Sequence, residues 1–230
     1  GNVGPMSEES DLVICQIPTS FTSNLSAGIN MIAVPLKPNE DWGLSDLASH
    51  IGSDLSAIIF YNTYIGEFVT YMPQLSSIAP TDVVITEGKG YIVIMQEPTD
   101  VTFEGTAWDG NVTLAKGINI LFVPLCPENE WRLNNLAEHI GSEVDCLIWY
   151  DKQINQYVSY FPPWPKDVPS NTVVKGDESY IVLMESEKRV TFTGKAWENK
   201  EPAPSPPNQQ AETTPILIVE SLVKQENANI

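Results

Sequence analysis

The sequence is poor in basic residues and has no long apolar run. Only 12 lysine and arginine residues stand against 30 aspartate and glutamate residues, which gives a formal net charge of −18. A surface this acidic repels nucleic-acid backbones and anionic lipids, so we expect no nucleic acid as a partner. No apolar stretch reaches the roughly 20 residues that cross a bilayer, so we also expect no membrane insertion.

The sequence also lacks a catalytic pattern. Its two histidines, His50 and His139, lie in different halves of the chain. No serine occupies a G-x-S-x-G motif, and Gly88-Lys89-Gly90 lacks the spacing of a phosphate-binding loop. We therefore expect no enzyme, no catalytic residue and no cofactor. A hydrolase would need a facing pair of carboxylates, which the sequence does not identify.

Cysteine is scarce, with three residues in the chain: Cys15, Cys126 and Cys146. None has a histidine or second cysteine at a zinc-ligand spacing, so we expect no metal site. Cys126 and Cys146 both belong to the second half and replace Lys37 and Ala57 of the first. Their joint appearance suggests a disulfide that closes about 20 residues and adds about 3 kcal/mol. The alternative is a pair of buried thiols.

The chain contains an internal repeat. Residues 25–108 align with residues 114–197 at a constant offset of 89 without a gap, and 34 of the 84 positions are identical. The shared segments include Gly-Ile-Asn, Val-Pro-Leu, His-Ile-Gly-Ser and Tyr-Ile-Val. A period near 90 residues has the size of a small domain, which is too long for a solenoid unit. The chain therefore contains two copies of one module.

Each copy has the same predicted elements. Residues 29–36 and 118–125 are apolar, β-branched runs that predict a strand buried on both faces. Leu44, Leu47, Ala48 and Ile51 have the spacing of a helix face, as do Leu133, Leu136, Ala137 and Ile140, and Gly52 and Gly141 are typical of a left-handed helix cap. A hairpin follows in each copy, at 57–61 with 67–71 and at 146–150 with 156–160. Gly66 and Asn155 indicate a left-handed residue in its turn.

Side chains alternate between the two faces of a strand, so residues two apart share a face. On this basis the inward face of the hairpin is expected to consist of Ile59, Tyr61, Val69 and Tyr71, and in the second copy of Ile148, Tyr150, Val158 and Tyr160. Two more strands, 90–95 and 101–104 with counterparts 179–184 and 190–193, complete the module. Because residues 11–17 align with 100–106, we expect the last strand of module one to serve also as the first strand of module two. Packing then fixes the orientation of the modules.

These elements predict a mainly β fold of α+β type. Each module has about six short, mostly antiparallel strands, arranged as a sandwich or open barrel, and one short helix. The expected organisation is a lead at 1–10, module one at 11–104, module two at 105–199, a proline-rich tether at 200–215 and an apolar strand or tail at 216–230.

Module two is rich in aromatic residues near its hairpin. Trp149, Tyr157 and Phe161 are expected to share the face opposite the core, and Trp164 lies in the rigid Pro162-Pro163-Trp164-Pro165 bend. This group is a candidate surface for a sugar ring or a protein partner. The alternative is that the face packs as ordinary core.

The C-terminal segment is unusually apolar. It follows a tether that reaches about 45 Å if extended, and its apolar residues are Ile216, Leu217, Ile218, Val219, Leu222 and Val223. One interpretation is that the segment folds back on its own modules or begins a further domain. The other is that it adds as a strand to the sheet edge of a neighbouring molecule.

Several segments resemble a family of tandem β-rich modules in secreted and cell-surface proteins of bacteria and archaea. The typical pattern of this family opens G-W-N-L-I-S-L-P-L, has a helix and a W-x-Y-D strand in the middle, and ends P-G-K-G-Y-W-I. The matching segments are 28–36, 117–125, Trp149-Tyr150-Asp151 and 88–92. The resemblance implies a non-enzymatic accessory or structural module and assigns no functional residue.

The sequence thus predicts a non-catalytic structural or adhesive protein that self-assembles through its C-terminal strand. Its partner would be another copy or a surface protein. Acidity and two glycosylation sequons, at Asn24 and Asn111, favour an extracellular or cell-surface location. The alternative is a carbohydrate-binding module that uses the aromatic residues of module two.

Overall fold

The computed structural model describes residues 19–78 and 83–199, which belong to one compact unit that ends at Asn199. Several predictions lie outside the described residues: the lead 1–10, the strand 11–17, the state of Cys15, the tether 200–215 and the strand 216–223.

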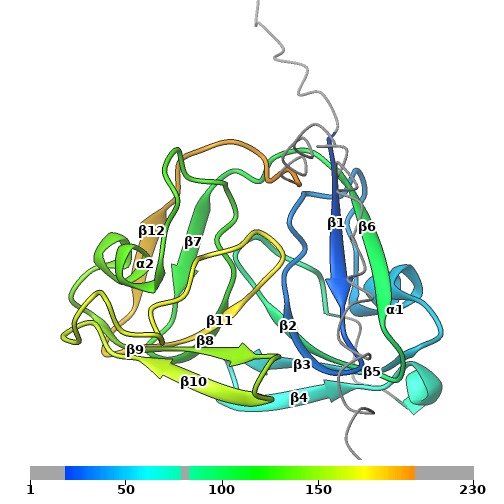
Figure 1. The fold of residues 1–230 in the computed structure, drawn as a ribbon. Helices are drawn as coiled ribbons and strands as arrows, with labels where there is room; N and C mark the ends of the chain where they lie inside the picture. Colours follow the sequence, from blue (N-terminus) through cyan, green and yellow to red (C-terminus); the bar gives the residue numbers. More distant parts are fainter. Residues whose placement is uncertain (1–18, 79–82, 200–230) are drawn as a thin grey trace, which may run out of the picture. The chain divides into compact units, whose positions relative to one another are not determined.

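The described part of module one contains six strands and one α-helix (Figure 1). They are β1 (Thr19–Leu25), β2 (Gly28–Ile32), α1 (Leu44–Ile51), β3 (Leu55–Asn62), β4 (Glu67–Tyr71), β5 (Tyr91–Met95) and β6 (Thr99–Gly105), with a short 3₁₀ segment, η1 (Pro73–Ile78), after β4.

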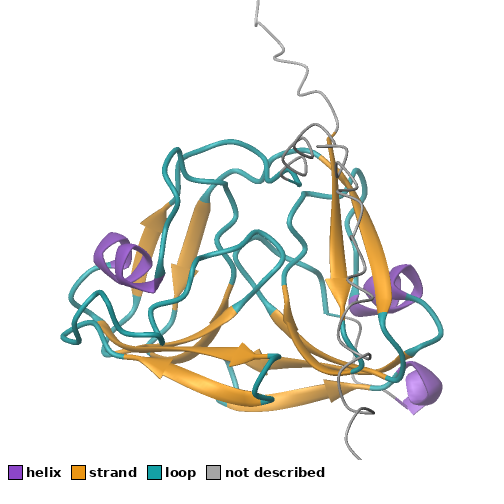
Figure 2. Ribbon diagram, viewed as in Figure 1, coloured by secondary structure: helices purple, strands orange, loops and turns teal. Residues whose placement is uncertain are grey.

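Module two repeats this order. Its elements are β7 (Asn111–Leu114), β8 (Gly117–Leu121), α2 (Leu133–Ile140), β9 (Val144–Asp151), β10 (Gln156–Tyr160), β11 (Tyr180–Met184) and β12 (Lys188–Thr191). The predicted mainly β, two-module fold is confirmed (Figure 2).

Each module has one four-stranded antiparallel sheet and one two-stranded ribbon. The sheets have the order β2-β5-β3-β4 and its equivalent β8-β11-β9-β10, and the ribbons pair β1 with β6 and β7 with β12. The prediction that one strand serves both modules is wrong, because β6 pairs with β1 along its whole length while module two begins with its own strand, β7.

The helices form where the apolar spacing predicts. In α1 the four expected residues, Leu44, Leu47, Ala48 and Ile51, are buried in the module-one core. The Asp46 carboxylate accepts a hydrogen bond from the Gly43 N–H at 2.8 Å, which caps the helix start. Gly52 follows the helix with φ 106° and ψ −171°, so it has the predicted positive φ but an extended rather than left-handed helical ψ.

The hairpin turns are confirmed, since Gly66 has φ 73° and Asn155 has φ 55°. The predicted inward face is only half correct. The register pairs Ile58 with Tyr71 and Phe60 with Val69, so these four residues face the module core. Ile59 and Tyr61 lie on the opposite face with Phe68, and their counterparts Ile148 and Tyr150 do the same with Tyr157.

That opposite face packs against the other module. Met31, Ile92 and Ile120 form a separate buried cluster, and the residues packed around it come from both modules: Ile29, Ile59, Tyr61, Tyr150 and Ile181. In agreement, β3 lies against β8 and β2 lies against β9. The central strands of each four-stranded sheet are therefore covered on both faces, which explains their β-branched, apolar sequences.

The contacts between the modules are reciprocal. Ile32 of module one forms a β-bridge with Glu178 of module two. The residues at the equivalent positions, Leu121 of module two and Lys89 of module one, form the same bridge. Reciprocal contacts of this kind define a two-fold interface, here within one chain. The symmetry is approximate, because Phe122 replaces Ala33 and enters the module-one core, where its ring meets that of Trp108 at 6.3 Å between centroids.

Gly90 and its equivalent, Ser179, meet each other at the junction. A Cβ atom placed on Gly90 would lie 2.2 Å from the Ser179 Cβ, so only one of the two positions can carry a side chain without rearrangement. The same reasoning applies to Gly88, where a Cβ would lie 2.5 Å from a methyl group of Val112. At the equivalent place in the other half, Asp177 takes the position of Gly88, and the smaller Ser23 takes the position of Val112.

Candidate functional site

The structure separates the aromatic residues that the sequence grouped as one surface. Trp149 pairs with Val158 in the β9–β10 register and packs against the module-two core, while Tyr157 pairs with Tyr150 on the opposite face. The expectation that Trp149 and Tyr157 share a face is therefore wrong. The Trp149 indole N–H donates to the Ser170 carbonyl at 3.2 Å, which anchors this side chain within its module.

Phe161 and Trp164 do lie together at the surface. Their ring centroids are 4.8 Å apart, and the side chains are 39% and 45% exposed. Tyr157 is also exposed, and its ring meets the edge of Tyr150 at 5.1 Å. The remaining candidate surface of module two thus consists of Tyr157, Phe161 and Trp164.

Exposed apolar residues recur at equivalent positions in module one. Four pairs are exposed in both copies: Ile65 and Ile154, Phe68 and Tyr157, Met72 and Phe161, Leu75 and Trp164. We call these eight residues the hairpin rows. Exposed apolar side chains that gather on one part of each module are typical of contact surfaces.

Each hairpin row adjoins a strand at the end of its sheet, β4 in module one and β10 in module two. The two edges differ in charge. β4 begins with Glu67, whereas β10, with the sequence Gln-Tyr-Val-Ser-Tyr, contains neither a charge nor a proline. Charged residues and proline are the usual means by which an edge strand avoids pairing, so β10 is the less protected edge.

The predicted Cys126–Cys146 disulfide is wrong, since the structure contains no bond between these two residues. Cys126 bridges to Lys195 beyond β12 and packs against the module-two core. Cys146 lies in β9 next to Leu147, which faces that core, so the Cys146 side chain alternates to the other face of the sheet. Burial raises the pKa of the Cys146 thiol.

The two histidines have structural positions. His50 lies between Trp42 and Phe103, with centroid distances of 4.7 and 5.3 Å, and its Nε2 lies 2.9 Å from the Thr102 carbonyl oxygen. His139 repeats this arrangement with Trp131, Phe192 and the Thr191 carbonyl. Each histidine therefore holds its helix to the ribbon of the same module.

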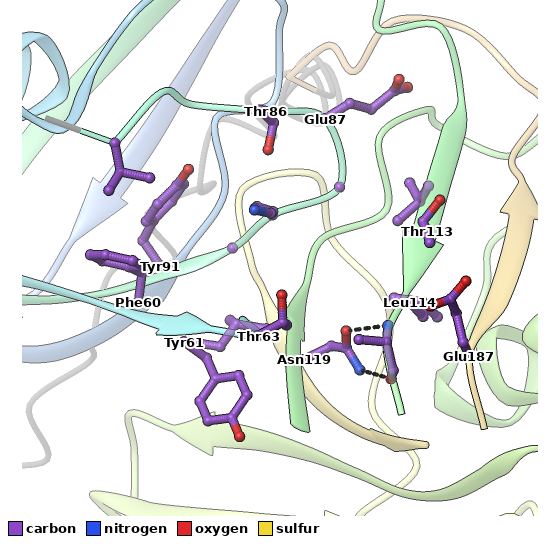
Figure 3. Close-up of a pocket in the computed structure, with 17 residues that line it drawn as sticks. Phe60, Tyr61, Thr63, Thr86, Glu87, Tyr91, Thr113, Leu114, Asn119 and Glu187 are labelled. Atoms are coloured by element: carbon purple, nitrogen blue, oxygen red, sulfur yellow. Dashed lines mark hydrogen bonds between the residues drawn. The ribbon is translucent and has the colours of Figure 1, made fainter. Parts of the chain in front are cut away.

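A cavity of about 420 Å³ lies at the junction of the modules (Figure 3). Module one contributes Phe60, Tyr61, Thr63 and the loop 86–90 before β5, and module two contributes parts of β7 and β8 with Glu187. Sequence reasoning missed this cavity because its walls come from segments that only the packing of the modules brings together.

Glu87 is the partly buried acid of the cavity. Its carboxylate accepts a hydrogen bond from the Gly110 N–H. Burial raises the pKa of Glu87, and the nearby Asp109 adds to the rise, while hydrogen bonds from the backbone of Gly110 and Asn111 oppose it. On the far side, the Asn119 side chain is fully engaged with the backbone of Ala115 and Gly117, so it shapes the wall.

Within residues 19–78 and 83–199, no group of three or more metal-ligating side chains is found. Over the same residues, no helix is long and apolar enough to cross a membrane.

Comparison with known proteins identified no related protein. No protein-family model matches the sequence, and neither the curated proteins nor the solved structures gave a match.

Proposed function

We propose that this chain is a non-catalytic, extracellular structural or adhesive protein that assembles with itself. In this proposal the C-terminal segment 216–223 of one molecule adds as a strand to β10 of a neighbour. The observation that carries the proposal is the position of β10 at the end of its sheet, without a charge or a proline, together with the exposed residues Tyr157, Phe161 and Trp164.

The C-terminal sequence matches this edge in chemistry. The run Ile216-Leu217-Ile218-Val219 is β-branched and apolar, and the proline-rich tether before it would give it a reach of about 45 Å if extended. Main-chain pairing at an open edge supplies affinity, while alternate side chains of the added strand contact exposed apolar residues. The like charges of Glu220 and Glu67 disfavour pairing of the segment with β4. This leaves β10 as the acceptor strand.

The exposure of Asn24 and Asn111 supports the extracellular part of the proposal. Both sequon asparagines lie at the surface, on the first strand of their respective ribbons. A glycan on either residue would extend into solvent without displacing core side chains.

Light scattering after size-exclusion chromatography tests the assembly. We expect the full chain to form assemblies whose mass grows with concentration and a chain that ends at Lys200 to be monomeric. Tyr157→Lys places a charge on the β10 edge and is expected to prevent assembly in the full chain. Phe68→Lys, the equivalent change on β4, is the matched control and is expected to leave assembly intact. A monomeric full chain would contradict the proposal.

The pair formed by Phe161 and Trp164 favours one second candidate, a carbohydrate-binding module. Two exposed aromatic rings 4.8 Å apart can stack on a sugar. Binding to a glycan array that is lost in Trp164→Ala, together with a monomeric full chain, would support this candidate over self-assembly.

A further inference from the structure

The cavity at the module junction has an equivalent on the other side of the approximate two-fold axis, and the two differ greatly in size. Adding 89 to Phe60, Tyr61 and Thr63 gives Trp149, Tyr150 and Lys152. With Met31, Glu178 and Ser179, these residues line a space of only about 10 Å³, compared with about 420 Å³ in the first site. We call the larger space the open site and the smaller one the closed site.

The differences that separate the two sites are changes of side-chain size. At the junction, Thr63 and Gly90 of the open site become Lys152 and Ser179 in the closed site. Each replacement is larger, so the second module fills with its own side chains the volume that the first module leaves empty. The backbone around the two sites is otherwise equivalent, because the β-bridges Lys89–Leu121 and Ile32–Glu178 correspond to each other.

Lys152 shows which chemical group this position accepts. Its Nζ donates to the Asn24 carbonyl oxygen of β1 at 3.4 Å. Packing around the side chain lowers the pKa of Lys152, and the carboxylates of Glu178 and Asp177 act in the opposite direction. The exposed side chain of Lys152 thus ends in an ammonium group that contacts a backbone carbonyl at the closed site, and the carboxylates of Glu178 and Asp177 act on it electrostatically.

The open site retains acceptors for such a group but has no ammonium of its own at this position. Thr113 is the equivalent of Asn24 and lines the cavity. Two carboxylates, those of Glu87 and Glu187, also line the cavity. The equivalent positions of the other half carry no charge, because Gly176 corresponds to Glu87 and Pro98 corresponds to Glu187. Lys89 is the only basic residue that lines the cavity, and no salt bridge in the described part of the chain involves any of these three charged side chains.

We propose that the open site binds a small aliphatic amine in its protonated form. Its alkyl part would contact Tyr61 and Ile120, and its ammonium group would be received by the Thr113 carbonyl and the Glu187 carboxylate. The formal charge of −18 on the chain favours a cationic ligand further. This site is independent of β10 and of the C-terminal segment.

Titration calorimetry with cadaverine (1,5-diaminopentane) on the full chain tests the site, with 1,5-pentanediol as the uncharged probe of equal length. We expect saturable binding of one cadaverine per chain, and at least tenfold weaker binding of the diol. Absence of saturable cadaverine binding at millimolar concentration, or equal binding of the diol, would overturn the proposal.

Two variants locate the binding. Thr63→Lys places in the open site the side chain that occupies the closed one, and it is expected to weaken cadaverine binding at least tenfold. Thr70→Lys adds the same charge on exposed β4 and serves as the control, with an expected change of less than twofold. Glu187→Gln is expected to weaken binding about three- to tenfold. Circular dichroism spectra confirm that each variant is folded, and unchanged binding in Thr63→Lys would place the ligand elsewhere and contradict the proposal.

Discussion

At the scale of single residues, the identities shared by the two copies have structural roles. Asn30 of the Gly-Ile-Asn motif is buried, accepts a hydrogen bond from the Ser26 N–H and donates to the Ser26 and Gly28 carbonyls. Asn119 makes the same three bonds in module two. The motif therefore closes the turn that precedes β2 and β8. Trp108 and Trp197 likewise donate to the equivalent carbonyls of Val34 and Val123.

Gly90 gives the most direct residue-scale prediction for the module interface. Gly90→Ser is expected to lower the free energy of unfolding by about 1–3 kcal/mol, because its Cβ would overlap with that of Ser179. The exchanged variant Gly90→Ser with Ser179→Gly is expected to recover at least half of the loss. Chemical denaturation measures both. A single variant as stable as the parent, or an exchanged variant as unstable as the single one, would show that these positions do not face each other.

Glu87 predicts a pH dependence. Its pKa is raised in the folded state by burial and by Asp109, so the folded chain holds this proton more tightly than the unfolded chain. The stability contributed by Glu87 is therefore greatest at low pH and is lost as pH rises through the raised pKa. We expect Glu87→Gln to gain stability relative to the parent between pH 4 and pH 7, by about 0.5 kcal/mol or less because the group is partly exposed. Denaturation curves at the two pH values measure it, and a relative loss over this interval would contradict the assignment.

At the scale of elements, the helices depend on contacts outside themselves. Each α-helix has only eight residues, which is too short to be stable alone in water. Burial of one apolar face and the histidine bond to the neighbouring ribbon hold it in place.

Removal of the His50 side chain tests this role. We expect His50→Ala to cost about 1–2 kcal/mol of unfolding free energy, because it removes a hydrogen bond to β6 and contacts with Trp42 and Phe103. Ser49→Ala, on the exposed part of the same helix, is the control, with an expected change within about 0.5 kcal/mol. Equal stability of the two variants would mean that the histidine does not anchor the helix.

The elements were largely predictable from the sequence because their signals are local. Periodicity identified both α-helices, and Gly66 and Asn155 identified the turns. The first strand of each ribbon was missed, since β1 and β7 are short and polar on one face. The inward face of β3 was misassigned for a different reason. Both faces of this strand are apolar, so alternation alone does not distinguish the module core from the module interface.

At the scale of the whole molecule, the duplication has produced a pair of modules that act as an internal dimer. The open site, the closed site and the contact between Gly90 and Ser179 exist only because the modules pack together. No pattern within one module encodes these features, which explains why the sequence identified the surface aromatics but not the cavity. In the proposed amine site the copies differ at Thr63 and Lys152, so this proposal rests on differences between the copies and not on their shared residues.

The proposed assembly also has a geometric consequence at this scale. The donor segment 216–223 and the acceptor β10 are different parts of the chain, so each molecule can give one strand and receive another. Contacts of this head-to-tail type close into rings or extend into filaments. The smallest closed form is a dimer in which two molecules exchange their segments reciprocally.

Negative-stain electron microscopy of the purified full chain tests the account most directly, alongside the chain that ends at Lys200 and the Tyr157→Lys variant. The account predicts filaments or rings for the full chain and single small particles for the other two. Single particles of the full chain at every concentration, or filaments that persist in the shortened chain, would contradict it.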